Sequence, residues 1–301
     1  MRRRTDLNLF DCHCDTLGRM AEENRCFQDP ALQSTSSRFT QRIQVFALWA
    51  DARWETPDAW RNILVQMKQY HGFPFLPKNY IGILSIEDGR IFADDLSRLS
   101  LAAALGVRIL TFFWRGPSPL GGAWDTDLGL TKCGREVLAE SFRLGIVPDV
   151  SHASTQSARD ILSLAERAGK PVLASHGGAF AVCPHRRNAK DDILRRVADS
   201  GGLVGLTMYP PHLRGPHCTL EDAATHLVHL WSLGLGDAMC LGCDFDGVDC
   251  LPDGLSGADD LPRFYCLLQQ YGIPDVLLQK LFYENGKHFT EVYLAKSAGS
   301  F

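Results

Sequence analysis

Short apolar runs rich in β-branched and aromatic residues recur along the chain, with enough residues between them to form a helix. Runs of this length, bounded by polar and turn-forming residues, are typical of strands buried in a sheet. They occur at Leu7–His13, Ile43–Ala50, Tyr80–Glu87, Val107–Phe113, Ile146–His152, Pro171–His176, Gly202–Tyr209 and Met239–Phe245. The sequence therefore predicts eight strands.

The segments between these runs have apolar residues at helical spacing. In Thr131–Gly145, the side chains of Val137, Leu138 and Phe142 form one apolar face, and Gly145 suits the carboxyl-terminal cap. Similar helices are expected at Pro57–Tyr70, Asp94–Leu105, Thr155–Ala168, Ala189–Ser200, Leu220–Leu233 and Pro274–Tyr293. Strands that alternate with helices form a parallel sheet, and eight repeats predict an α/β fold of the (β/α)8 TIM barrel type.

An open, doubly wound sheet is the structural alternative. The chain lacks the glycine-rich fingerprints of dinucleotide-binding sheets and P-loops, which weakens the nucleotide-binding versions of that fold. It also lacks a low-complexity linker and a repeat of fixed period, so residues 1–301 are expected to form one domain.

Composition and charge narrow the partners. A formal net charge of -4 does not favour binding to nucleic acid or to an anionic membrane, because both need a positive surface. The charged start Met1–Asp6 precedes an apolar run too short for a secretory signal, and no apolar segment reaches the roughly 18–20 residues of a membrane span. We expect a cytoplasmic protein with a small-molecule substrate, in which the 10 cysteines are free, buried thiols.

In a barrel of this type, active-site residues lie at the carboxyl ends of the strands. The first predicted strand ends in His13 and Asp15, which side-chain alternation places on one side as a pair that can bind a cation, with Cys12 and Cys14 pointing away. A hydrogen-bonded polar pair at a strand end is the alternative interpretation.

Three further candidates end other predicted strands. Glu87 ends the third, and a carboxylate can bridge two metal ions with its two oxygens. His152 and His176 end the fifth and sixth, and neutral imidazole is a favoured zinc ligand. Taken singly, each could be a turn or strand-end residue. Their shared position at one end of the barrel favours a metal site.

Asp244 and Asp246 end the eighth strand, and one of them is expected to face the barrel mouth as a general acid and base. An Asx turn before Gly247 is the alternative. The other histidines fall in predicted loops or helices, where solvated or half-buried side chains are expected: His71, His185, His212, His217, His226, His229 and His288.

These motifs, in this order, resemble the membrane (renal) dipeptidase family of zinc hydrolases. The matching segments span nearly the whole chain: Asp11-Cys-His-Cys-Asp15, Ile86-Glu-Asp-Gly89, Gly129–Val137, Asp149-Val-Ser-His-Ala-Ser154, Ala174-Ser-His-Gly-Gly-Ala179, Val182–Asn188 and Gly242-Cys-Asp-Phe-Asp-Gly247. This chain resembles the bacterial-type members that have no lipid-anchor tail.

The resemblance implies two Zn2+ ions, one held by His13 and Asp15 and the other by His152 and His176, with Glu87 bridging them. It implies that Asp244 moves the proton and that Arg187 binds the free carboxylate of a dipeptide. His152 and Trp114 are the other expected substrate-binding residues. A guanidinium group matches a carboxylate with two parallel hydrogen bonds, so this residue would measure where the substrate ends.

The expected function is therefore a metallo-dipeptidase that attacks the peptide bond with water activated between two zinc ions, and the resemblance suggests tolerance of a C-terminal D-residue. One departure is Trp114, which stands where many family members have a histidine. Two alternatives remain open: a binuclear hydrolase acting on another amide, lactam or lactone, and a binding protein with weak activity. The sequence does not decide the oligomeric state, for which a homodimer is considered.

Overall fold

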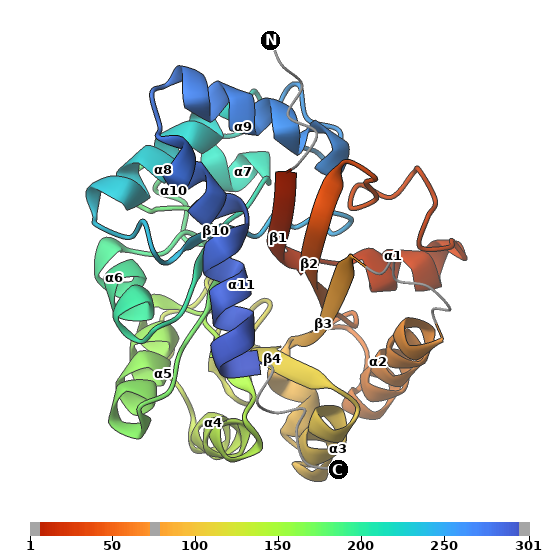
Figure 1. The fold of residues 1–301 in the computed structure, drawn as a ribbon. Helices are drawn as coiled ribbons and strands as arrows, with labels where there is room; N and C mark the ends of the chain where they lie inside the picture. The colour runs from red at the N-terminus through yellow and green to blue at the C-terminus, as the bar shows by residue number, and fades with distance from the viewer. Residues whose placement is uncertain (1–6, 73–78, 295–301) are drawn as a thin grey trace.

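Eight parallel strands form the centre of the chain in a computed structural model that describes residues 7–72 and 79–294 (Figure 1). Their order is β7-β4-β3-β2-β1-β10-β9-β8, and each neighbouring pair is parallel. A parallel bridge between Asp149 and Leu173 joins the two edge strands and closes the sheet into a barrel. The predicted (β/α)8 barrel is confirmed.

All eight predicted strands are present, most of them shorter than expected. Their bounds are β1 Leu7–Cys14, β2 Phe39–Leu48, β3 Tyr80–Glu87, β4 Val107–Thr111, β7 Val147–Asp149, β8 Ala174–Gly177, β9 Val204–Leu206 and β10 Met239–Leu241. β4, β7, β9 and β10 end earlier than predicted, because their carboxyl-terminal residues leave the sheet at the barrel mouth, whereas β8 begins later. His152, predicted at a strand end, lies three residues beyond Asp149, the last residue of β7.

The predicted helices are also present: α2 Thr56–His71, α3 Ser97–Ala104, α4 Lys132–Leu144, α5 Thr155–Ala168, α6 Asp191–Asp199 and α8 Leu220–Ser232. In α4, Thr131 caps the amino end by accepting from the backbone of Gly134, and Gly145 caps the carboxyl end with a φ of 71°. The segment predicted at Pro274–Tyr293 forms α10 Asp275–Gln279, η3 Lys280–Glu284, α11 Asn285–Phe289 and η4 Thr290–Leu294.

Several elements were not predicted. These are α1 Thr16–Glu23, α7 Pro210–Leu213, α9 Leu261–Gln270, the 3-10 turns η1 Gly89–Phe92 and η2 Ala258–Asp260, and the small hairpin of β5 Pro117–Ser118 and β6 Gly121–Gly122. Among them, α1 and α7 follow β1 and β9 on the carboxyl side of the barrel. Both contribute side chains to the cavity described below.

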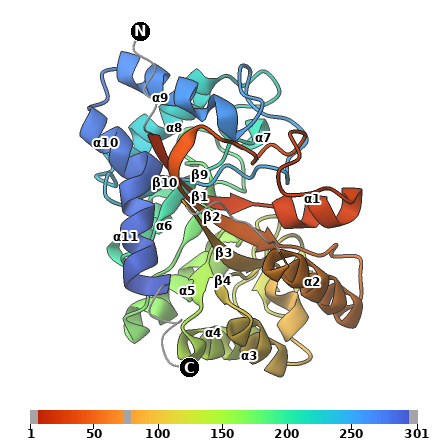
Figure 2. The same ribbon diagram turned by 45° about the vertical axis from the view of Figure 1, so that its right-hand side comes forward.

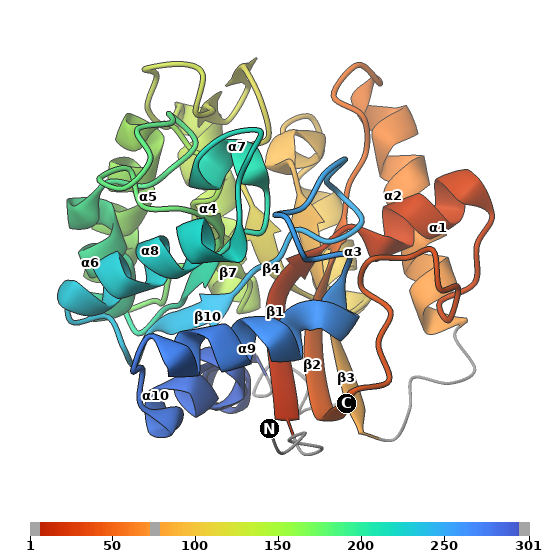
Figure 3. The ribbon, with the colours of Figure 1, turned by 90° about the horizontal axis from the view of Figure 1, so that it is seen from above.

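In Figure 2 the strands lie at the centre with helices around them. Two apolar layers hold this barrel together. An inner cluster fills the barrel with one or two side chains from each strand or from the residue just before it, including Phe10, Ile43, Ile83 and Leu173. An outer cluster packs the strands against the surrounding helices. In Figure 3, α7 and α10 lie at opposite ends of the barrel: α7 lies near the mouth, and α10 lies near the floor.

The 10 cysteines are free, as expected, but only five of them are buried: Cys12, Cys14, Cys218, Cys240 and Cys243. Cys133, Cys183 and Cys266 are partly exposed, and Cys26 and Cys250 are exposed. Within residues 7–72 and 79–294, no helix combines the length and apolar character needed to cross a membrane. The charged segment 1–6 lies outside the described residues.

Candidate metal centre and substrate cavity

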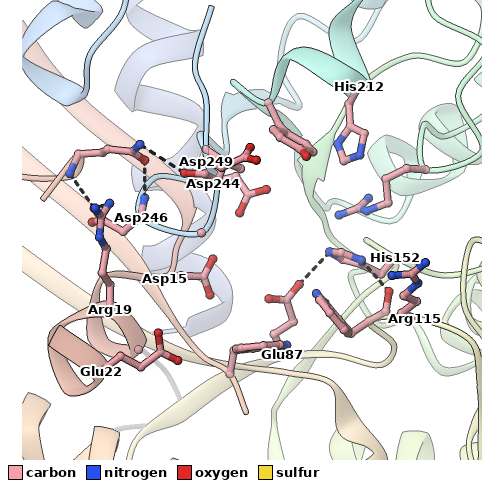
Figure 4. Close-up of a pocket in the computed structure, with 18 of the residues that line it drawn as sticks. Asp15, Arg19, Glu22, Glu87, Arg115, His152, His212, Asp244, Asp246 and Asp249 are labelled. Atoms are coloured by element: carbon pink, nitrogen blue, oxygen red, sulfur yellow. Dashed lines mark hydrogen bonds and ion pairs between the residues drawn. The ribbon is translucent and has the colours of Figure 1, made fainter. Parts of the chain in front are cut away.

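A cavity of about 630 Å³ opens at the carboxyl ends of the strands, a size within the range of small-molecule sites. Figure 4 shows Asp15, Arg19 and Glu22 on one side of it and His152, His212 and Arg115 on the other. The cavity brings together most of the predicted site residues: Asp15, Glu87, Trp114, His152, Arg187 and Asp244.

The first predicted ligand group, His13, Asp15 and Glu87, converges at one side of this cavity. Nε2 of His13 lies 3.4 Å from Oδ2 of Asp15 and 3.6 Å from Oε2 of Glu87. Two ligand atoms that each lie about 2.1 Å from one zinc ion at a tetrahedral angle are about 3.4 Å apart. The spacing is too long for hydrogen bonds and fits an ion between the three atoms.

A bulge in β1 directs His13 into the barrel mouth. Asp11 pairs with Gln44 of β2, and Cys14 pairs with Phe46. Between these two pairs β1 advances three residues and β2 only two, so β1 contains one extra residue. The extra residue breaks the side-chain alternation on which the sequence argument relied. The prediction that both cysteines point away from the site is therefore wrong for Cys12, which packs inside the barrel, and only Cys14 packs in the outer layer.

The second group consists of Glu87, His152 and His176. Nε2 of His152 lies 2.9 Å from Oε1 of Glu87 and 3.0 Å from Nε2 of His176, which is itself 3.5 Å from Oε1 of Glu87. Glu87 thus offers one oxygen to each group, as a bridging carboxylate would.

The other nitrogen of each imidazole fixes which nitrogen carries the proton. Nδ1 of His152 lies 2.9 Å from the carbonyl oxygen of Trp114, so it must donate. Nδ1 of His176 lies 2.7 Å from the hydroxyl of Ser175, which donates its own hydrogen to Asp149. Both Nε2 atoms are therefore unprotonated in the neutral rings, and two lone pairs meet a carboxylate oxygen. A cation between these three atoms would offset the repulsion of their lone pairs.

A buried carboxylate supports the second group from below. Asp149 is fully buried and accepts hydrogen bonds from the backbone of Ser151 and Ser175 and from the hydroxyls of Thr111 and Ser175. Through Ser175 it fixes the tautomer of His176, and it orders the backbone that leads to His152. Asp149 belongs to the motif Asp149–Ser154, but nothing in that motif indicates this supporting role.

The pKa shifts of Glu87, His152 and His176 favour the protonation states that bind metal ions. Burial opposes ionisation of Glu87, but His13 and His152 outweigh it and hold the pKa of this carboxyl well below its usual value. Burial lowers the pKa of His152, with a contribution from Arg187, and burial together with His13 holds the pKa of His176 well below its usual value. An ionised carboxylate and neutral imidazoles are the forms that bind metals.

His13 differs from the other two imidazoles. Burial disfavours its charged form, but Glu87 and Asp15 outweigh burial and raise the pKa of His13 well above its usual value. Its Nε2 is buried and has no hydrogen-bond partner. In the metal-free chain a proton on His13 offsets the charge of the two carboxylates, and an ion would replace that proton.

Backbone strain is concentrated at the same strand ends. Asp88, His152, Asp244 and Asp246 all have φ between 63° and 74°, in the left-handed region that non-glycine residues rarely adopt. Each follows a strand and redirects the chain at the barrel mouth. Strain of this kind is retained where function requires a fixed side-chain direction.

The two aspartates after β10 have different environments. Asp246 accepts hydrogen bonds from Thr16 and from the backbone of Gln33 and Ser34, so it anchors the loop through distant segments of the chain, unlike the local hydrogen bond of the Asx turn given as the alternative. Asp244 lines the cavity, with Oδ1 3.8 Å from Nε2 of His13. Burial raises the pKa of Asp244 to about 7, and Asp15 and Glu87 contribute to the rise. Asp244 also belongs to a third ligand group, with His13 and His176.

Arg187 and Trp114 lie on the cavity wall. Arg187 is only 6% exposed, and Nε and Nη2 of its guanidinium group are buried without a hydrogen-bond partner. A buried cation with unused donors fits an anionic ligand. The carbonyl oxygen of Trp114 accepts a hydrogen bond from Nδ1 of His152. The indole ring of Trp114 packs against that of Trp49, with 5.1 Å between the ring centroids.

Two of the histidines expected to be solvated or half-buried are buried. His212 lies in the cavity wall and its Nδ1 has no hydrogen-bond partner, and His226 is fully buried between the backbone of Ala179 and that of Leu213 in α7. The segment of His212, Tyr209-Pro-Pro-His212, follows a predicted strand, and that position was the available signal.

The comparisons with known proteins agree with this geometry. The family model for membrane dipeptidases, peptidase family M19, matches residues 77–292. An uncharacterised dipeptidase of Schizosaccharomyces pombe is 33% identical over 172 residues, which cover 54% of this chain and 41% of that protein. The match therefore spans less than half of the yeast relative.

Solved structures share the fold. The metallopeptidase dipeptidase AC, of family M19, has a TM-score of 0.87 at 24% identity, over 96% of this chain and 99% of that one. A metallopeptidase from Rhodobacter sphaeroides, bound to a phosphinate mimic of L-Ala-D-Ala, has a TM-score of 0.84 at 24% identity, over 95% and 99%. Since the family model covers most of the sequence, this chain belongs to the membrane dipeptidase family, peptidase family M19.

Proposed function

We propose that this chain is a zinc-dependent dipeptidase with two metal ions. The observation that carries the proposal is the meeting of the unprotonated Nε2 atoms of His152 and His176 with the carboxylate of Glu87. His152 and His176 would hold one ion, His13 and Asp15 would hold the other, and Glu87 would bridge them. Imidazole and carboxylate are ligands that zinc accepts readily.

Such ions, when bound, supply Lewis acidity toward the peptide carbonyl and toward the attacking water. The chain's own residues supply the remaining steps. Asp244 takes a proton from the water as the water oxygen bonds to the carbonyl carbon, and it gives a proton to the amine nitrogen as the C–N bond breaks. The carboxyl group of Asp244 is buried beside the other site residues, which suits it both to accept and to donate a proton.

Arg187 would restrict the substrate to two residues. Its partnerless Nε and Nη2 match the two oxygens of a carboxylate, and a carboxylate held there belongs to the residue that follows the scissile bond. This feature favours a dipeptide over a lactam or lactone without a free carboxylate. Tolerance of a C-terminal D-residue is part of the proposal, and the L-Ala-D-Ala mimic bound to the Rhodobacter sphaeroides protein supports it.

Metal analysis combined with a substrate panel tests the proposal. We expect two zinc equivalents per chain and turnover of L,L- and L,D-dipeptides, with little turnover of tripeptides or dipeptide amides. Turnover of lactones or of amides without a carboxylate, in place of dipeptides, would contradict the assigned substrate. We also propose that residues 1–301 form one barrel domain.

A further inference from the structure

His212 is a buried polar side chain without an evident structural use. It lies in α7, lines the cavity, and is 9% exposed. Its ring contacts the rings of Tyr209 and His185, each at 4.9 Å between centroids, and its Nδ1 is buried with no hydrogen-bond partner. Burying a polar group without a partner is unfavourable, so a bound ligand that pairs with the imidazole would offset a cost already present in the fold.

The imidazole is neutral. Burial lowers the pKa of His212 to about 2, and the positive charge of Arg187 contributes to the shift. A neutral ring lies beside a guanidinium without charge repulsion and still carries one N–H donor. It therefore adds a hydrogen bond for an acceptor without adding a second buried charge.

His212 and Arg187 are held together as one unit. Asn188, next to Arg187, donates to the carbonyl oxygen of His212 at 2.7 Å and accepts from the backbone of Gly178 at 2.8 Å. His226 accepts from the backbone of Ala179 at 3.0 Å and lies 3.0 Å from the carbonyl oxygen of Leu213, the residue after His212. Two buried side chains thus join the loop of Arg187 to α7.

The contact between these segments is close. A Cβ atom on Gly178 would lie 2.8 Å from Oδ1 of Asn188, 2.9 Å from Cε1 of His226 and 3.0 Å from the carbonyl oxygen of His212. Even a methyl group would force the loop and α7 apart. The positions of Arg187 and His212 are therefore set relative to each other before a ligand binds.

We propose that His212 is a second substrate-binding residue, whose imidazole N–H donates to the same carboxylate that Arg187 binds. A carboxylate has about four acceptor positions, and a guanidinium occupies two of them, which leaves an oxygen lone pair for the imidazole. The inference rests on the proposed function and deepens it, because it makes recognition of the free carboxylate depend on two donors.

The test compares two ligands that differ only at the carboxyl end. A phosphinate mimic of a dipeptide and its C-terminal carboxamide are titrated into the metal-loaded enzyme, and the ratio of their dissociation constants is measured. For His212→Phe, which keeps a ring and removes the donor, we expect this ratio to fall about tenfold, the effect of one hydrogen bond to a charged group. His212→Asn places an amide N–H near the position of Nδ1, and His212→Gln places one near the position of Nε2. One of these two variants should restore the ratio of the unmodified enzyme.

His229→Phe is the matched control, because His229 lies on the neighbouring helix α8, pairs with Asp191, and does not line the cavity. Its ratio should equal that of the unmodified enzyme. If His212→Phe does not fold, His212→Leu provides the same comparison. An unchanged ratio in the folded variant, or equal weakening of both ligands, would overturn the inference. Failure of the proposed function is a separate result, namely no turnover of any dipeptide by the unmodified enzyme.

Discussion

The Nε2 atoms of His152 and His176 face each other at 3.0 Å, and the second nitrogen of each ring is already engaged as a donor. Two unprotonated nitrogens do not attract at this distance, and the oxygen of Glu87 beside them adds a third lone pair. A metal ion resolves the arrangement because all three atoms can bind it at once. The predictions below follow from this relationship and from the residues that maintain it.

Replacing Glu87 by Gln should lower the bound metal from two equivalents to one or none. The amide keeps the volume of the side chain but loses the charge that both ligand groups share. Inductively coupled plasma mass spectrometry of the purified variant measures the metal content. Glu22→Gln is the control, since Glu22 lines the same cavity outside the ligand groups and should retain two equivalents.

Asp244→Asn should retain the metals and lose turnover. We expect kcat to fall by about 10²–10⁴-fold, the usual contribution of a positioned acid or base, with KM little changed. Steady-state kinetics with parallel metal analysis measure this. The control Asp249→Asn alters another carboxylate of the cavity wall and should leave kcat unchanged. Loss of metal in Asp244→Asn would instead assign Asp244 to the third ligand group.

Arg187→Met should abolish the preference for a free carboxylate. Loss of hydrogen bonds to a charged group reduces kcat/KM for a dipeptide by about 10–100-fold, and the dipeptide amide should be unaffected. The ratio of kcat/KM for the two substrates is the measurement. Equal losses on both substrates would show that Arg187 acts on the fold or on the metals and not on the carboxylate.

Metal binding should release protons and weaken as the pH falls. Glu87 and Asp15 raise the pKa of His13, so His13 is protonated in the metal-free chain near neutral pH and must lose that proton to become a ligand. Affinity therefore rises with pH until His13 is deprotonated. Calorimetric titration in two buffers with different ionisation enthalpies counts the protons. Binding with no proton release at pH 7 would contradict the role of His13.

Asp149→Asn should weaken both the fold and the second ligand group. One carboxylate oxygen of Asp149 becomes an amide that cannot accept from Thr111 and Ser175, and a mispaired buried group costs about 1–3 kcal/mol of unfolding free energy. Metal affinity should fall about 10–100-fold, as is usual when a group that orients a ligand is removed. Denaturant unfolding of the metal-free chain and zinc titration measure the two effects. Asp199→Asn, at an exposed carboxylate, should change neither.

The sequence was sufficient to predict the barrel because eight apolar runs alternate with amphipathic segments. It also located the convergent residues, since the strand ends of a parallel barrel share one rim. Helix α9 could have been predicted as well, because Leu261, Phe264, Tyr265 and Leu268 have helical spacing and are buried on one face.

Other features had no usable local signal. The bulge that directs His13 inward follows from the pairing of β1 with β2, and Asp-Cys-His-Cys-Asp contains no glycine to indicate it. The left-handed residues at the mouth are aspartates and a histidine, so their backbone direction is set by tertiary contacts. The proposed use of His212 depends on Asn188, which bonds the carbonyl oxygen of His212, and on His226, which bonds that of Leu213, and both come from other segments of the chain.

The central claim is that one rim of the barrel binds two ions that share Glu87. X-ray diffraction from crystals grown with zinc, recorded on both sides of the zinc absorption edge, tests it most directly. The account predicts two anomalous peaks, one among His13, Asp15 and Glu87 and the other among Glu87, His152 and His176. A map from the fully loaded protein with no peak beside Glu87, or with zinc bound only elsewhere on the chain, would contradict it.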